Sequence, residues 1–207
     1  MPPMPNRSPR PRLACTATLL IAGLAGATLH AEDQPLLSFV DLRAQAGVAA
    51  NSGRLAELTL MAGDIGDKSV HTIDVDSSLG IVIGVRGISE LIPFERSPDG
   101  TVHLYGGELL GGIGIYAGAE DHIEVVAGYG KGYMSFKDSH TDFHKDGDAT
   151  ILLGEVGWFH TFDEHYQLGI TAGYAINRIT LNGSNGANGD SFKSNGINAT
   201  LAVGYRF

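Results

Sequence analysis

The chain has 207 residues, enough for one domain with a core or for one small barrel, and its formal net charge is −9. An acidic chain offers no basic face to the phosphates of a nucleic acid, which argues against such a partner. The single cysteine, Cys15, lies near the N-terminus, so the rest of the chain has neither a disulfide framework nor thiolate chemistry.

The first 31 residues have the layout of a secretory signal peptide. Three arginines precede an apolar run that ends near Leu29, and Ala31 suits the cleavage site. An uncleaved anchor helix is the alternative, but the apolar run is short for a membrane span. Removal of the three arginines leaves 11 basic and 23 acidic residues, a net charge of −12. We therefore predict a signal peptide at 1–31 and one domain at 32–207.

The first expected strand is 40–50. Its odd positions include Asp41, Arg43 and Gln45, whereas its even positions carry only valine, leucine and alanine. An unbroken apolar row opposite charged residues is typical of a strand with one face in lipid and the other lining a lumen.

Residues 51–78 have a weaker pattern. We predict a long loop at 51–69, a second strand near 68–75 and a turn at 76–78, with an extra hairpin, and hence ten strands, as the alternative. The next strands are expected at 79–92, 104–118, 123–136, 150–162 and 166–181. Long polar loops are expected at 93–103, 137–148 and 182–194, and short turns at 119–122 and 163–165. Lys131 falls on an apolar face, which a bulge or the lipid headgroup zone would explain.

The last strand, 196–207, has the clearest alternation of apolar with polar or small residues. Its Thr200, Tyr205 and Phe207 resemble the C-terminal assembly signal of bacterial outer-membrane β-barrels, although Ala202 stands where that family usually has glycine. The closing residues also resemble the end of small barrels of the OmpX/Ail type, and the whole pattern resembles the OmpA-barrel group.

This resemblance implies an all-β fold, an antiparallel up-and-down transmembrane β-barrel of eight strands, with long extracellular loops and short periplasmic turns. Aromatic residues near the predicted strand ends suit the two interfacial girdles of such a barrel. The expected location is the outer membrane of a Gram-negative bacterium.

Charged residues at alternate strand positions form the predicted lumen network. In a narrow lumen such acids and arginines are expected to pair, because an unpaired buried charge is costly. A satisfied polar plug is favoured over a gated ion path, since side chains fill the interior of small barrels. The predicted members are Asp41, Arg43, Arg86, Glu108, Glu124, Glu155 and Arg206.

The part of the 138–148 loop from His140 to Asp148 contains two histidines and three aspartates that could in principle hold a divalent cation. Their spacing fits no calcium loop, because Leu153 occupies the twelfth position counted from Asp142. A solvated acidic loop is therefore favoured, and we expect no metal and no cofactor. The five residues are His140, Asp142, His144, Asp146 and Asp148.

No catalytic set is evident, and we predict that the protein is not an enzyme. Histidines such as His103 and His122 fall in predicted loops and turns, His160 falls on a lipid face, and no His-x-Ser pairing accompanies Ser135. A lipid A-modifying activity would require the fold to bring a serine and a histidine together.

The predicted function is therefore structural, adhesive or surface-interacting, carried by the extracellular loops of a monomer. The alternatives are a narrow porin-like channel, a lipid-modifying enzyme, and a secreted soluble barrel with inverted faces that binds a small apolar ligand. The expected partners are outer-membrane lipids, lipopolysaccharide, the outer-membrane assembly machinery and a host or surface ligand.

Overall fold

A computed structural model describes residues 38–49, 53–72, 75–94, 100–118, 120–138, 144–182 and 188–207. The predicted signal peptide lies outside these ranges. The described residues form eight strands: β1 (Phe39–Ala49), β2 (Gly53–Thr72), β3 (Val75–Phe94), β4 (Gly100–Ala117), β5 (Asp121–Asp138), β6 (His144–Phe162), β7 (Tyr166–Asn182) and β8 (Asn188–Arg206).

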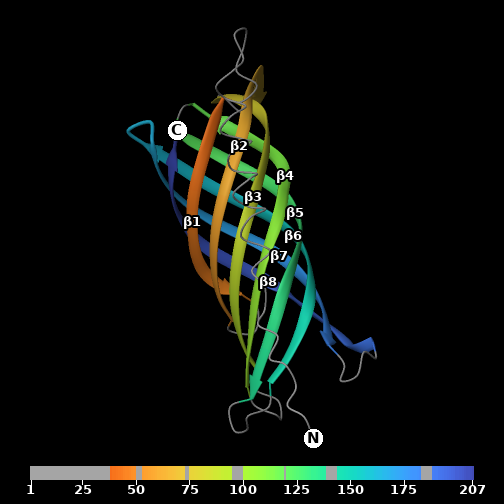
Figure 1. Cartoon of the computed structure of the whole chain (residues 1–207). Coiled ribbons are helices and arrows are strands. Elements are labelled where there is room, and N and C mark those ends of the chain that lie inside the picture. Colours follow the sequence, from red (N-terminus) through yellow and green to blue (C-terminus); the bar gives the residue numbers. More distant parts are fainter. Residues whose placement is uncertain are drawn as a thin grey trace, which may run out of the picture. The chain divides into compact units, whose positions relative to one another are not determined.

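The strands form one closed antiparallel barrel in sequence order (Figure 1). Each strand pairs with the next, and β1 closes the ring by pairing with β8 from Asp41↔Arg206 to Val48↔Ala199. Closure pairs the edges that the first and last strands of an open sheet would leave exposed. The predicted eight-stranded up-and-down barrel is confirmed. The ten-strand alternative is wrong for the described residues.

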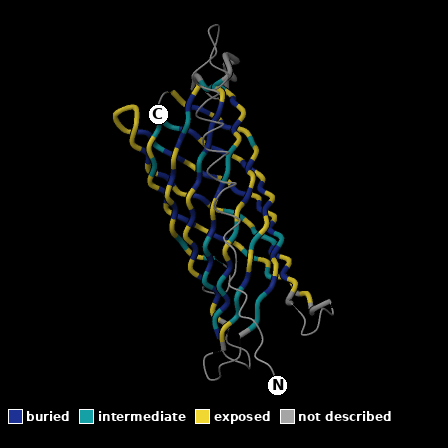
Figure 2. The backbone as a smooth tube through the Cα atoms, in the orientation of Figure 1, coloured by how far each residue is buried: buried dark blue, intermediate teal, exposed yellow. Residues whose placement is uncertain are grey.

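Exposed and buried positions alternate along the strands (Figure 2), and the exposed positions carry many large apolar side chains. On β8, Ile197 and Leu201 are 71% and 70% exposed, whereas the intervening Thr200 is 4% exposed. Successive side chains of a strand point to opposite faces, so a polar or small set turns inward. The faces therefore have the arrangement of a membrane barrel, and the inverted arrangement of a soluble carrier is wrong.

The structure corrects the prediction for residues 51–78. Strand β2 begins at Gly53, so the predicted loop at 51–69 is strand from residue 53 onward, and the predicted second strand near 68–75 lies at the end of β2 and the start of β3. The inner face of β2 carries Leu55 and Met61 beside Glu57 and Thr59, and all four are buried. Both faces of β2 thus contain apolar residues, which conceals the period of two.

The other long loops are also shorter than predicted. The described parts of the segments 93–103, 137–148 and 182–194 are strand, because the backbone ladders continue through these polar residues. We call the end with connections at 50–52, 95–99, 139–143 and 183–187 the loop end. The opposite end, with connections at 73–74, 118–120 and 163–165, is the turn end, and Arg206 lies there beside His165 (Figure 1).

Two apolar clusters lie inside the barrel. The cluster nearer the loop end contains Ile88, Ile92, Val102, Leu104, Met134, Ala149, Ile151 and Ile179. The other contains Phe39, Met61, Val82, Leu110, Tyr116, Val126 and Leu153. The described ranges contain no helix that is long and apolar enough to cross a bilayer.

Candidate functional site

Arg43 is the centre of an ion-pair network at the turn end of the lumen, and its side chain is 2% exposed. Its Nη1 and Nη2 donate to the two carboxylate oxygens of Glu124 at 2.6 and 2.7 Å, and Nη2 also donates to Asp41 at 2.7 Å. Its Nε donates to Gln167 at 3.2 Å. Fork-to-fork geometry of this kind gives strong, oriented hydrogen bonds. The guanidinium ties β1 to β5 and β7 across the lumen.

Aromatic rings and a second arginine complete this turn-end network. Arg206 donates to both oxygens of Asp41 at 2.8 and 2.9 Å. The Arg43 guanidinium carbon lies 3.9 Å from the centroid of the Phe159 ring. The His122 ring stacks between Tyr116 and Phe159, with both centroid distances 5.2 Å, and its Nε2 lies 3.3 Å from Glu124. Two arginines face two carboxylates, so the charges balance.

Arg86 is the centre of a second network, midway along the lumen. Its Nη2 and Nη1 donate to Glu155 at 2.5 and 3.2 Å, and its Nη1 also lies 3.4 Å from Glu57 and 3.9 Å from Glu108. Its Nε donates to Thr59 at 3.2 Å. Three carboxylates therefore share one guanidinium. The central network has an excess of acidic groups, whereas the charges of the turn-end network balance.

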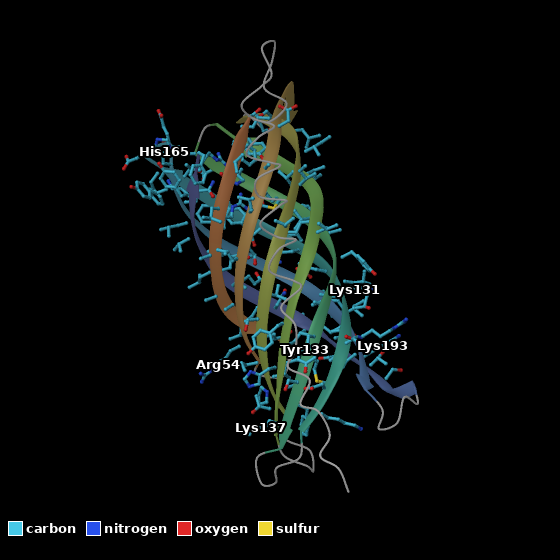
Figure 3. The ribbon with its side chains drawn as sticks, viewed as in Figure 1. Arg54, Lys131, Tyr133, Lys137, His165 and Lys193 are labelled. Carbon is cyan, nitrogen blue, oxygen red and sulfur yellow. The ribbon has the colours of Figure 1, made fainter. Side chains whose placement is uncertain are left out.

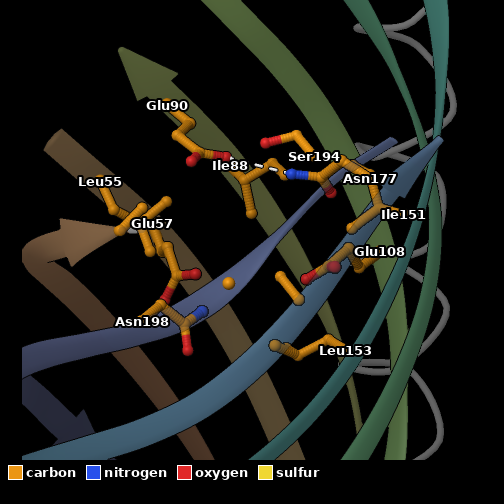
Figure 4. A pocket seen from close by; sticks show the side chains of 13 residues that line it. Leu55, Glu57, Ile88, Glu90, Glu108, Ile151, Leu153, Asn177, Ser194 and Asn198 are labelled. Atoms are coloured by element: carbon orange, nitrogen blue, oxygen red, sulfur yellow. Dashed lines mark hydrogen bonds between the residues drawn. The ribbon is translucent and has the colours of Figure 1, made fainter. Parts of the chain in front are cut away.

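A small cavity adjoins the central network on its loop-end side (Figure 4). Its lining includes Glu57, Glu90, Glu108 and Asn177, and the Asn177 amide donates to Glu90 at 3.4 Å. The volume of the cavity is about 30 Å³. One water needs about 10–15 Å³, so the cavity has room for about two waters. This is far smaller than a continuous water-filled channel.

The described residues contain one group with the donor set of a metal site, namely Asp41, His122 and Glu124. All three are buried, and their ligand atoms lie within 4.8 Å of one another. The Arg43 guanidinium already donates to both carboxylates. A divalent cation there would lie against a fixed positive charge, so the group is better described as part of the ion-pair network.

All seven residues of the predicted lumen network point into the barrel. Asp41, Arg43, Glu124 and Arg206 join the turn-end network, whereas Arg86, Glu108 and Glu155 form most of the central network. Sequence reasoning missed His122, which was placed in a turn, and Glu57, which was placed in a loop. The parity of His122 relative to Glu124 was an available signal, whereas the apolar Leu55 and Met61 on the inner face of β2 conceal the alternation around Glu57.

The predicted assembly-signal residues lie on the two faces of β8. Thr200 is buried and its hydroxyl lies 2.8 Å from that of Thr171. Tyr205 and Phe207 point outward with their ring centroids 5.0 Å apart, and Tyr205 also packs edge-on against Tyr166. The Phe207 amide donates to the Val40 carbonyl at 2.9 Å. Their role as an assembly signal stays a prediction.

The predicted metal loop lies only partly in the described ranges. His140 and Asp142 lie outside them, and the side chain of His144 is not described. Asp146 and Asp148 lie at alternate positions of β6, on its outer face. A metal site in this loop stays an untested hypothesis, and the solvated acidic loop stays the favoured prediction.

The fold does place one serine opposite a histidine, since Ser135 on β5 pairs with His103 on β4 and with Asp146 on β6. The His103 ring, however, contacts its own strand, with Nδ1 lying 3.3 Å from the Tyr105 hydroxyl. Asp146 is therefore the register partner of Ser135 and not of His103. A general base needs its own orienting partner, so this row lacks the arrangement of a hydrolase triad.

Solved structures of outer-membrane proteins share the architecture of this chain. Ail of Yersinia pestis, solved with the heparin analogue sucrose octasulfate, is 12% identical, with a TM-score of 0.44, and the match covers 82% of this chain and 97% of Ail. A major outer membrane protein of Thermus thermophilus is 12% identical (TM-score 0.42; 82% and 98% covered). OprG of Pseudomonas aeruginosa is 14% identical (TM-score 0.41; 82% and 95% covered).

No protein-family model and no curated protein matches the chain. The predicted resemblance to small outer-membrane barrels agrees with the eight strands and the closed ring of the chain itself, and the matched structures indicate no function at these identities.

Proposed function

We propose that the protein is an integral outer-membrane barrel with a plugged lumen, which acts through the surface at its loop end. The main support for this proposal is the division of side chains between the outer and inner faces of the barrel. Large apolar residues cover the exterior, whereas charged residues are buried inside and paired. In lipid, a closed barrel is one of the two structures that satisfy every backbone group internally.

The height of the apolar surface matches a bilayer. On β7 the outward residues from Tyr166 to Ile176 are apolar, and Arg178 and Thr180 follow them. These ten residue steps span about 25 Å along the barrel axis, at about 3.3 Å per residue and a tilt of about 40°. Outer-membrane barrels carry an apolar band of about this height. The shorter connections at the turn end then face the periplasm.

The plugged lumen supports a surface role over transport. Both charged networks and both apolar clusters occupy the interior, and the cavity beside Glu57 has room for about two waters. The surface left for contact with other molecules is the loop end, where the strands continue past the apolar band. A structural or adhesive role fits this surface.

Two measurements test this proposal. Purified protein in planar lipid bilayers is expected to show no stable current steps. In intact cells, a membrane-impermeant amine reagent is expected to label Lys137 and Lys193 at the loop end, as mapped by peptide mass spectrometry, while a soluble periplasmic protein stays unlabelled. Labelling only after the outer membrane is opened would contradict the proposed location or orientation.

A narrow cation path is the second candidate, and the acid excess of the central network favours it. Three carboxylates around Arg86, with Glu90 beyond them, would attract cations to the cavity. This candidate predicts cation-selective current steps that are reduced by Glu108→Gln. A silent bilayer with folded protein would eliminate it.

A further inference from the structure

A row of cations crosses the outer face of four neighbouring strands near the loop end. Lys131 on β5 pairs with Thr150 on β6, Thr150 with Arg178 on β7, and Arg178 with Lys193 on β8. All three cationic side chains are exposed, and the threonine is half-buried. Figure 3 shows Lys131 and Lys193 on the same side of the barrel, with Arg54 on another. We call these four residues, Lys131, Thr150, Arg178 and Lys193, the cationic row.

The cationic row lies immediately beyond the apolar band. The preceding outward residues toward the turn end are Tyr129 on β5, Leu152 on β6 and Ile176 on β7. On β5 and β7, one step of two residues therefore changes the outer face from apolar to cationic, whereas on β8 the polar Asn195 precedes Lys193. This is the depth at which lipid headgroups begin, and it also explains Lys131, the misfit in the predicted apolar face.

Among the residues that the structure describes, none of Lys131, Arg178 and Lys193 has a carboxylate within 4.0 Å. The nearest acid by register is Asp148, which lies two residues from Thr150 toward the loop end and pairs with Tyr133 and Thr180.

Arg178 and Lys193 are directly opposite each other on one face of an antiparallel pair. The Cβ atoms of such partners are about 4.5–5.5 Å apart, and like charges placed this way are destabilising. A local conflict of this kind in an otherwise consistent strand is expected at a functional site. An anion lying across both side chains would remove the conflict.

We propose that the cationic row is a binding site for a phosphorylated glycolipid of the outer leaflet, with its phosphates on Arg178, Lys193 and Lys131. The inference rests on the proposed membrane location. Arginine and lysine are the usual phosphate ligands, and the Thr150 hydroxyl adds a donor between them. The acyl chains of the same lipid would lie along the apolar residues below the row, so one molecule satisfies both surfaces.

The test uses the folded, purified protein in neutral detergent, with bis-phosphorylated lipid A as the probe. Binding is measured by native mass spectrometry and by titration. Dephosphorylated lipid A, phosphatidylglycerol and inorganic phosphate serve as comparisons. We expect lipid A to bind at least tenfold more tightly than its dephosphorylated form or phosphatidylglycerol, and inorganic phosphate to compete only at far higher concentration.

The variant Arg178→Gln/Lys193→Gln is expected to lose at least tenfold in lipid A affinity, and Lys131→Gln several-fold. Arg54→Gln is the matched control, because Arg54 is an exposed outward cation of β2 outside the row. In detergent alone, Arg178→Gln is expected to raise the unfolding temperature, since it removes the like-charge pair.

Wild-type affinity in the double variant, or an equal loss in Arg54→Gln, would overturn the proposal. Equal affinities for inorganic phosphate and lipid A would refute the glycolipid as the ligand and would show that the row binds phosphate alone. Folding is checked separately by gel mobility before and after boiling. If the wild-type protein shows no folded form in that assay, the proposed function fails. If the double variant is folded and still binds lipid A, the result contradicts the lipid site at the cationic row but not the proposed function.

Discussion

Placing a charge at the middle of the apolar band tests where the bilayer lies on the barrel. Leu201 points outward from β8 and is 70% exposed. It is four residues from Ile197 and four from Tyr205, which is about 10 Å from each edge of the band at about 3.3 Å per residue and a tilt of about 40°. Arginine at the midplane costs about 2–4 kcal/mol, so Leu201→Arg should lower the free energy of unfolding by that amount.

The assay is equilibrium unfolding by denaturant from phospholipid vesicles. Trp158, the only tryptophan of the chain, faces outward on β6 and reports transfer from lipid to water through its fluorescence. Asn195→Arg is the matched control, because Asn195 faces outward on the same strand at the edge of the band, where the cost falls to about 0–1 kcal/mol. Equal costs at the two positions would refute the assignment of Leu201 to the midplane.

Other changes test the lumen, the chain end and the packing of the wall. Arg43→Met should cost about 3–5 kcal/mol in the same unfolding assay, because it leaves the buried Glu124 carboxylate without its guanidinium while Asp41 keeps Arg206, and adding Glu124→Gln should recover part of that loss. Deletion of Phe207 should lower the yield of folded protein in the outer membrane, and a normal yield would contradict the assembly-signal prediction. Gly112→Ala should destabilise by about 1–3 kcal/mol, because its Cβ would meet the Val125 carbonyl oxygen. Gly111→Ala, which meets nothing within 4 Å, should change stability by less than about 1 kcal/mol.

The sequence predicted the strands whose two faces differ most. Strand β8 alternates without interruption from Ile197 to Phe207, so its faces could be assigned from the period of two alone. Strand β2 could not be assigned in this way, because Leu55 and Met61 share its inner face with polar residues. The inside of a small barrel is packed partly with apolar side chains, and wherever they enter a strand the contrast between its faces disappears.

The partners inside the lumen could not be predicted. Arg43 and Glu124 are 81 residues apart in sequence, and their contact depends on the register and tilt of all the strands between them. The position of His122 depended on one turn boundary. The turn closes at residue 120, after Gly118 with a φ of 71°, and β5 begins at Asp121, which turns His122 inward. Parity with Glu124 would have placed it correctly.

The most direct test of a closed barrel in the outer membrane is gel mobility of the protein from an isolated outer-membrane fraction, unboiled against boiled in detergent. A barrel closed by the pairing of β1 with β8 should stay folded in detergent until it is boiled, so the two samples should migrate differently. Recovery of the protein in the soluble periplasmic fraction, with no shift on boiling, would contradict the membrane barrel.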